Sequence, residues 1–123
     1  MHQYQQSIIV KTQLEALHQW GNIPSEHPSQ YLKNSHRHLF QIELRFHVNH
    51  SDRDIEFIAF KQQVDQFIQN YFIRDTQSGL INLQNYSCEM LGNLLIQKYH
   101  FDGCYCVQIL EDGEMGSIVE YIE

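Results

Sequence analysis

The chain has 123 residues, enough for one domain with its own hydrophobic core, so we expect residues 1–123 to form a single domain. Its net charge is −7 and its lysines and arginines form no cluster, which argues against nucleic acid and anionic membranes as partners. No apolar run approaches the ~20 residues that span a bilayer, and the start lacks signal-peptide features, so we expect a cytoplasmic protein.

The first half of the chain predicts two strands that are separated by a long loop. Residues 7–14 are a short strand candidate, and residues 21–33 hold both prolines and are typical of a loop. From residue 36 to 48, apolar side chains occupy the even positions from Phe40 onward, while mostly polar ones occupy the odd positions. This alternation predicts a strand with one buried face.

The second half predicts two helices and then two strands. An apolar stripe at helical spacing predicts the first helix, with Phe60, Val64, Phe67, Ile68 and Tyr71 on one face. Ser87 is a suitable N-cap for a second helix, which should end before the "HFDG" break. Residues 104–111 and 117–122 alternate as strands around the Asp-Gly of "EDGEMG". The expected order is therefore strand, strand, helix, helix, strand, strand.

The three cysteines are Cys88, Cys104 and Cys106. Two of them form a C-x-C on one expected strand, where both side chains would point to the same face. Neighbours on one strand face are poorly placed for an unstrained disulfide, so we expect reduced thiols. Cys104 and Cys106 could bind a metal, although packing as small apolar side chains is the simpler interpretation.

His36 and His38 begin the second strand and raise the question of a metal site. Residues i and i+2 of a strand lie ~7 Å apart on the same face, so two imidazoles can converge on one ion. Both share the parity of the apolar face and would point inward, where each ring nitrogen needs a partner. A metal ion would be the partner for one nitrogen of each ring. The alternative is two strand-end histidines that are buried without a metal.

His18, in "LEALHQW", is the candidate for a third ligand. It follows the first strand, and an antiparallel partner would bring that end beside the start of the His36 strand. Three neutral histidines with one open position are typical of a catalytic zinc site. The competing interpretation makes His18 a surface residue before a loop.

Five segments occur in an order and at spacings that are similar to the motifs of a known family: "LEALHQW", "LKNSHRHLF", "FIAFKQQV", "SCEMLGNLL" and "QILEDG". On these segments the chain, from about residue 8 to 121, resembles the 6-pyruvoyltetrahydropterin synthase and 6-carboxytetrahydropterin synthase family. The second of these enzymes serves queuosine precursor synthesis in bacteria.

The resemblance implies an α+β fold, the tunnelling fold (T-fold). In it, a four-stranded antiparallel sheet carries two helices on one face in the order ββααββ. It also implies zinc (Zn²⁺) as the metal, with His18, His36 and His38 as its ligands, and a pterin-like small molecule as the ligand. Because such a sheet has two exposed edges that need covering, the resemblance implies a homo-oligomer, either a trimer or a hexamer.

The same resemblance gives Glu111, in "QILEDG", the role of binding the amino-pyrimidine edge of a pterin. An ionised carboxylate can accept two parallel N–H hydrogen bonds from such an edge. The alternative is that Glu111 is an exposed acid beside the Asp-Gly turn.

The chain departs from the family where proton transfer is expected. The position of the catalytic cysteine holds Leu32, that of a helix aspartate holds Ala59, and the later Asp-His pair has no counterpart. Glu26, His27 and Asp75 are candidate substitutes for the base.

Two functions stay open. One is a zinc-dependent carbon-oxygen or carbon-carbon lyase acting on a reduced pterin or dihydroneopterin triphosphate. The other is a non-catalytic relative that serves ligand binding or protein assembly.

Overall fold

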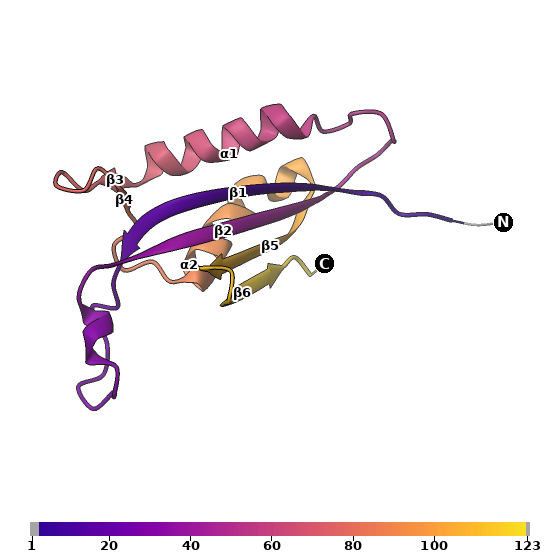
Figure 1. The fold of residues 1–123 in the computed structure, drawn as a ribbon. Coiled ribbons are helices and arrows are strands. Elements are labelled where there is room, and N and C mark those ends of the chain that lie inside the picture. Colours follow the sequence, from indigo (N-terminus) through magenta and orange to yellow (C-terminus); the bar gives the residue numbers. More distant parts are fainter. Residues whose placement is uncertain (1–2, 123) are drawn as a thin grey trace.

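A sheet and two helices form the two layers of the fold (Figure 1) in the computed structural model, which describes residues 3–122. The strands lie side by side in the order β3-β4-β1-β2-β5-β6. The strands are β1 (Ser7–His18), β2 (His36–His47), β3 (Ile73–Arg74), β4 (Ile81–Asn82), β5 (Cys104–Glu111) and β6 (Met115–Glu120). The helices are α1 (Phe57–Tyr71) and α2 (Cys88–Tyr99), with short 3-10 turns η1 (Gln30–Lys33) and η2 (His100–Asp102).

The expected four-stranded antiparallel T-fold subunit with the order ββααββ is wrong. The chain inserts β3 and β4 between the two helices, and β4 joins the sheet beside β1. The β1–β4 pairing is parallel, through Ala16 with Ile81 and Leu17 with Asn82, so the six-stranded sheet is mixed. Each added strand has only two residues, which is too short for apolar and polar residues to show an alternating pattern.

The longer elements lie close to their expected positions. The predicted strands 36–48 and 104–111 correspond to β2 and β5, and the first strand continues four residues past Leu14. It continues because the antiparallel ladder with β2 extends until His18 pairs with His36. Ser87 caps α2 as predicted, since its side chain accepts a hydrogen bond from the Met90 N–H at 3.2 Å.

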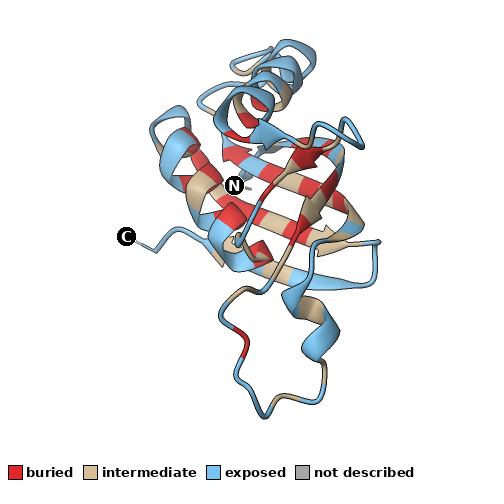
Figure 2. Ribbon diagram, turned by 90° about the vertical axis from the view of Figure 1, so that its left-hand side faces the viewer, coloured by how far each residue is buried: buried red, intermediate tan, exposed pale blue. Residues whose placement is uncertain are grey.

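The hydrophobic core lies between the sheet and the helices (Figure 2). Even-numbered residues of β1 and β2 point into it and meet apolar side chains of both helices. The core includes Val10, Phe40, Ile42, Leu44, Val64, Ile68, Leu91 and Leu95. The other sheet face carries charged residues, including the Arg37–Glu15 ion pair at 2.7 Å. No helix within residues 3–122 combines the length and the apolar character needed to cross a bilayer.

A β-bulge in β5 separates the two cysteines of the C-x-C. Cys106 pairs with Arg45 of β2, but Cys104 pairs with Phe46, which leaves Tyr105 as the extra residue. Phe46 points into the core and Arg45 points away from it, so Cys104 joins the core and Cys106 takes the other face. The expectation that both side chains share one face is therefore wrong. Both thiols are free and buried.

Gly103 ends η2 at φ +97°, and an added Cβ would lie 2.8 Å from the His47 carbonyl oxygen. We predict that Gly103→Ala lowers the free energy of unfolding by about 2 to 4 kcal/mol, because left-handed strain adds to a backbone clash. Gly79→Ala is the matched control, since Gly79 has φ +75° but nothing within 4 Å of an added Cβ. It should cost only about 1 kcal/mol. Urea unfolding of both variants measures the difference, and equal losses would contradict the clash.

Candidate metal centre

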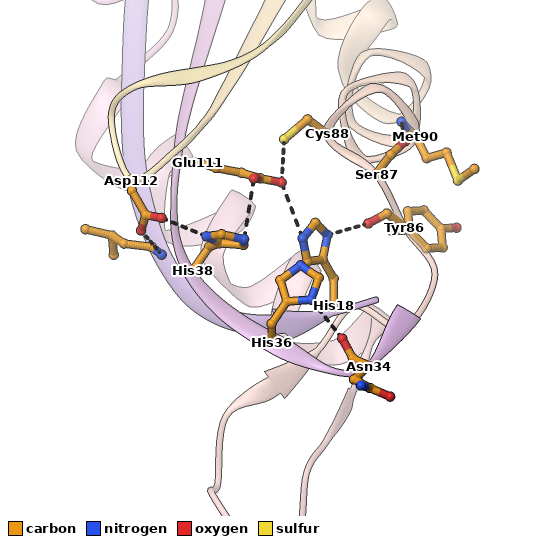
Figure 3. A network of polar contacts seen from close by, with 11 residues as sticks. His18, Asn34, His36, His38, Tyr86, Ser87, Cys88, Met90, Glu111 and Asp112 are labelled. Carbon is orange, nitrogen blue, oxygen red and sulfur yellow. Dashed lines mark hydrogen bonds and ion pairs between the residues drawn. The ribbon is translucent and has the colours of Figure 1, made fainter. Parts of the chain in front are cut away.

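Three histidines meet at one end of the sheet (Figure 3). His18 ends β1 and pairs with His36, the first residue of β2, while His38 follows two residues later on the same face. The ring centroids lie 4.6 Å apart for His18 and His36, 5.0 Å for His36 and His38, and 5.3 Å for His18 and His38. One nitrogen of each ring lies within 4.8 Å of the other two. The structure thus brings the three predicted ligands together.

Each of the three rings has its Nδ1 atom against an oxygen acceptor. The partners are the Tyr86 carbonyl for His18 (3.0 Å), the Asn34 carbonyl for His36 (2.8 Å) and Asp112 Oδ2 for His38 (2.7 Å). An acceptor at Nδ1 favours the tautomer with the proton there, which leaves the lone pair of Nε2 available. Burial also lowers the pKa of His18 below its ordinary value, which favours the neutral ring that binds metals.

Asp112 is a site residue that the sequence analysis missed. It lies in the β5–β6 turn with φ 55°, and its carboxylate has two partners. Oδ2 accepts from His38 Nδ1, and Oδ1 accepts from the Leu39 N–H at 2.9 Å. These hydrogen bonds, first that from Leu39, lower the pKa of Asp112. The Asp-Gly pair predicted the turn. It could not predict that the aspartate orients His38, because that contact depends on where β2 lies beside the turn.

Glu111 lies directly beside the histidine cluster. Its Oε1 is 3.3 Å from His18 Nε2 and its Oε2 is 3.5 Å from His38 Nε2. The side chain is 23% exposed, so the carboxylate is partly shielded from water but still accessible. The residue predicted to bind a pterin edge therefore faces the same space as the nitrogens that would bind a metal.

Cys88, the first residue of α2, adds a thiol to the site. Its Sγ–H donates to Glu111 Oε1 at 3.6 Å. Burial, together with the nearby Glu111 carboxylate, raises the pKa of the Cys88 thiol to about 12. At neutral pH the group is a protonated donor that helps to hold Glu111, not a thiolate. A cysteine thus lies in the site, but it comes from α2 and not from the position of Leu32.

Two of the three candidate substitutes for the catalytic base, Asp75 and His27, have contacts elsewhere. Asp75 accepts the N–H and O–H of Ser78 in the β3–β4 turn, and these bonds lower its pKa, which makes it a weaker base. His27 accepts the Ser29 N–H, and its ring lies 5.0 Å from that of Trp20. Glu26 is exposed in the same loop, which projects away from the sheet in Figure 1. None of these contacts supports a role at the histidines.

Comparison with known proteins gives a likeness of fold. No protein-family model matches the chain, and no curated protein matches it. Among solved structures, the chain is similar to an uncharacterized protein from Wolinella succinogenes, with a TM-score of 0.62 and 11% sequence identity. The likeness covers 96% of this chain and 99% of that chain. Both proteins therefore share one architecture over nearly their whole length.

We predict that Asp112→Asn weakens zinc binding about 10- to 100-fold, because the amide accepts from His38 less strongly and carries no charge to support the ring. Glu114→Gln is the matched control, since Glu114 is an exposed acid of the same turn. Competition with a chromophoric zinc chelator measures both affinities. Equal affinities for the two variants would show that Asp112 does not orient a metal ligand.

Proposed function

We propose that this protein holds one zinc ion through His18, His36 and His38, and that this centre, with Glu111 beside it, binds and acts on a small polar molecule. The observation that carries the proposal is that hydrogen-bond acceptors face each other at the site. His18 donates from Nδ1 to the Tyr86 carbonyl, so its Nε2 is an acceptor, yet Glu111 Oε1 lies only 3.3 Å away. His38 likewise donates from Nδ1, to Asp112, so its Nε2 is also an acceptor, and it lies 3.5 Å from Glu111 Oε2.

Two acceptors at this distance repel each other unless a positive group lies between them or beside them. Protonation of the rings is one solution, and Glu111 favours it at His18, but burial first, and then His36 and His38 when they are charged, lower the pKa of that ring. Several imidazolium ions in one partly buried cluster would repel each other. A single divalent ion satisfies all three Nε2 atoms and attracts the carboxylate, with no charged imidazole required.

Three histidine ligands leave one position of a tetrahedral zinc ion open. A zinc ion held by these residues would acidify a water or hydroxyl group bound to it. Glu111 would be the acceptor for that proton, because its carboxylate faces the ligand nitrogens. Cys88 holds one oxygen of that carboxylate, and Asp112 holds the ring of His38. This division of roles supports an enzyme in which Glu111 is the base.

A reduced pterin is the ligand class that the resemblance implies, and we propose it as the first class to test. The four-stranded topology no longer supports the resemblance, but the segments with the three histidines and Glu111 converge on one site. A pterin edge would compete for Glu111, because a carboxylate that accepts two N–H bonds from a ring cannot also face both histidines. Ring binding and proton acceptance would therefore be alternative uses of Glu111.

The second candidate function is ligand binding without turnover. It is favoured by Leu32 and Ala59, which cannot transfer protons, and by the engagement of Asp75 with Ser78. In that case the ion and Glu111 would hold a ligand, and the chain would lack the rest of a catalytic set. The two candidates differ in whether a bound pterin is converted.

The metal prediction is direct. Protein purified with zinc and without chelators should contain close to one zinc equivalent per chain, and His36→Ala should lose most of it, because two histidines bind far more weakly than three. His50→Ala is the control, since His50 is an exposed loop residue paired with Asp54. Elemental analysis gives the stoichiometry. Zinc-free wild type under these conditions would end the proposal.

A paired assay tests the ligand. We expect neopterin to bind the zinc-loaded protein, and Glu111→Gln to weaken that binding about 10- to 100-fold through loss of a charge-assisted hydrogen bond. Calorimetry measures binding, and product formation from dihydroneopterin triphosphate measures turnover. Binding with turnover supports the enzyme, and a loss of ~10² or more in kcat at saturating substrate for Glu111→Gln identifies Glu111 as the base and not only as a ring contact. Binding without turnover supports the second candidate, and absence of both would exclude pterins as the ligand class.

We also propose that the chain forms a homo-oligomer, a trimer or a hexamer, through its free strand edges. β4 pairs with β1 only at Ala16 and Leu17, so within residues 3–122 the part of β1 before Ala16 has no strand neighbour on that side. At the other end of the sheet, β6 is an edge strand with Ile118 exposed. Unpaired edges favour association between chains. Light scattering at micromolar concentration should give a mass well above 14.7 kDa, and a monomer would contradict the prediction.

A further inference from the structure

A second cavity lies at the far end of the β1–β2 ladder from the three histidines. It has a volume of about 680 Å³, within the range of small-molecule sites. Its walls come from the segment before β1, the end of β2 and the loop after it, the start of β5, and residues next to α2 and β6. His47 in its wall pairs with Ser7, eleven ladder positions from the His18–His36 pair, or roughly 35 Å along the strands.

Two stacked ring pairs form part of the wall. His47 and Tyr105 stack with centroids 4.0 Å apart and planes at 15°, and His100 and Tyr121 stack at 3.9 Å and 25°. Tyr105 is held further, because its hydroxyl hydrogen-bonds to Ser7 Oγ at 2.9 Å and its carbonyl accepts the Tyr121 N–H at 2.8 Å. The rings are therefore held in place before any ligand arrives, which lowers the entropy cost of binding.

The rest of the lining is polar but carries few charged groups. Gln5, Gln6 and Asn49 contribute amides, which can both donate and accept hydrogen bonds. Among residues 3–122, no carboxylate, lysine or arginine lines the cavity, although the chain has 15 acidic and 8 basic residues. Within residues 3–122, the histidines of this cavity form no cluster at metal-binding distances. The lining thus suits neither a metal ion nor a strongly charged ligand.

We propose that this cavity binds a planar, uncharged heteroaromatic compound, namely a purine nucleoside. The purine ring would stack on the His47–Tyr105 and His100–Tyr121 pairs, and the amides would hydrogen-bond to its edge and to the sugar hydroxyls. Loss of one stacking contact between a base and an aromatic side chain weakens binding about 5- to 150-fold. A nucleotide is a poorer fit, because its phosphate would meet no lysine or arginine among the described lining residues and would approach a chain of net charge −7.

Calorimetry of the zinc-loaded, full-length protein with guanosine and with adenosine tests the proposal. At least one of them should bind, and Tyr121→Leu and Tyr105→Leu should each weaken binding at least 10-fold. Tyr105→Phe should retain binding, because it keeps the ring and loses only the hydroxyl bond to Ser7. Tyr31→Leu is the matched control, since Tyr31 is an exposed tyrosine of η1 outside the cavity, and it should change nothing. Guanosine monophosphate should bind more weakly than guanosine.

His36→Ala separates this site from the metal centre, because a nucleoside held in the second cavity should bind this variant as it binds wild type. Amide NMR signals of His47 and Tyr105 should shift on titration, which locates the ligand even if a leucine variant fails to fold. The proposal is overturned by the absence of binding for both nucleosides at millimolar concentration. Three other results would also overturn it. They are loss of nucleoside binding in His36→Ala, unchanged binding in Tyr121→Leu, and tighter binding of guanosine monophosphate than of guanosine.

Discussion

The register of the β1–β2 ladder is the constraint on which the candidate metal centre depends. Pairing of His18 with His36 places the last residue of one strand opposite the first residue of the next, and His38 then falls on the same face. A slip of one residue would turn every side chain of one strand to the other face, separating the histidines and exposing Phe40 and Leu44. The core residues that fix this register therefore also hold the histidines together.

The end of β5 contributes two acids to the same centre from adjacent positions. Glu111 is the last strand residue and faces the histidine Nε2 atoms, whereas Asp112 begins the turn and reaches His38 Nδ1. The left-handed backbone at Asp112, φ 55°, redirects the chain so that consecutive carboxylates approach one imidazole from its two nitrogens. Asp112 thus fixes the orientation of the His38 ring through Nδ1, while Nε2 of the same ring faces Glu111.

The longer elements and the shared face of His36 and His38 could be predicted because they depend on local patterns, whereas the position of His18 followed from the expected pairing of the first two strands. Alternation revealed β2 and β5, helical spacing revealed α1, and the parity shared by His36, His38 and Phe40 showed that these side chains have one face in common. The rest depends on contacts between distant segments. The two-residue strands β3 and β4 have no detectable period, and the bulge at Tyr105 appears only when β5 is paired with β2. Asp112 and Cys88 meet the centre only through tertiary packing.

The protonated state of the Cys88 thiol affects how the protein reacts with oxidants. Peroxides attack thiolates, and burial, together with the nearby Glu111 carboxylate, raises the pKa of this thiol and keeps it protonated at neutral pH. Burial, and after it the carboxylate that accepts the thiol hydrogen bond, therefore both disfavour conversion of the sulfur to sulfenic acid. The cysteine beside the histidines should therefore react with peroxides more slowly than a cysteine that is kept as a thiolate.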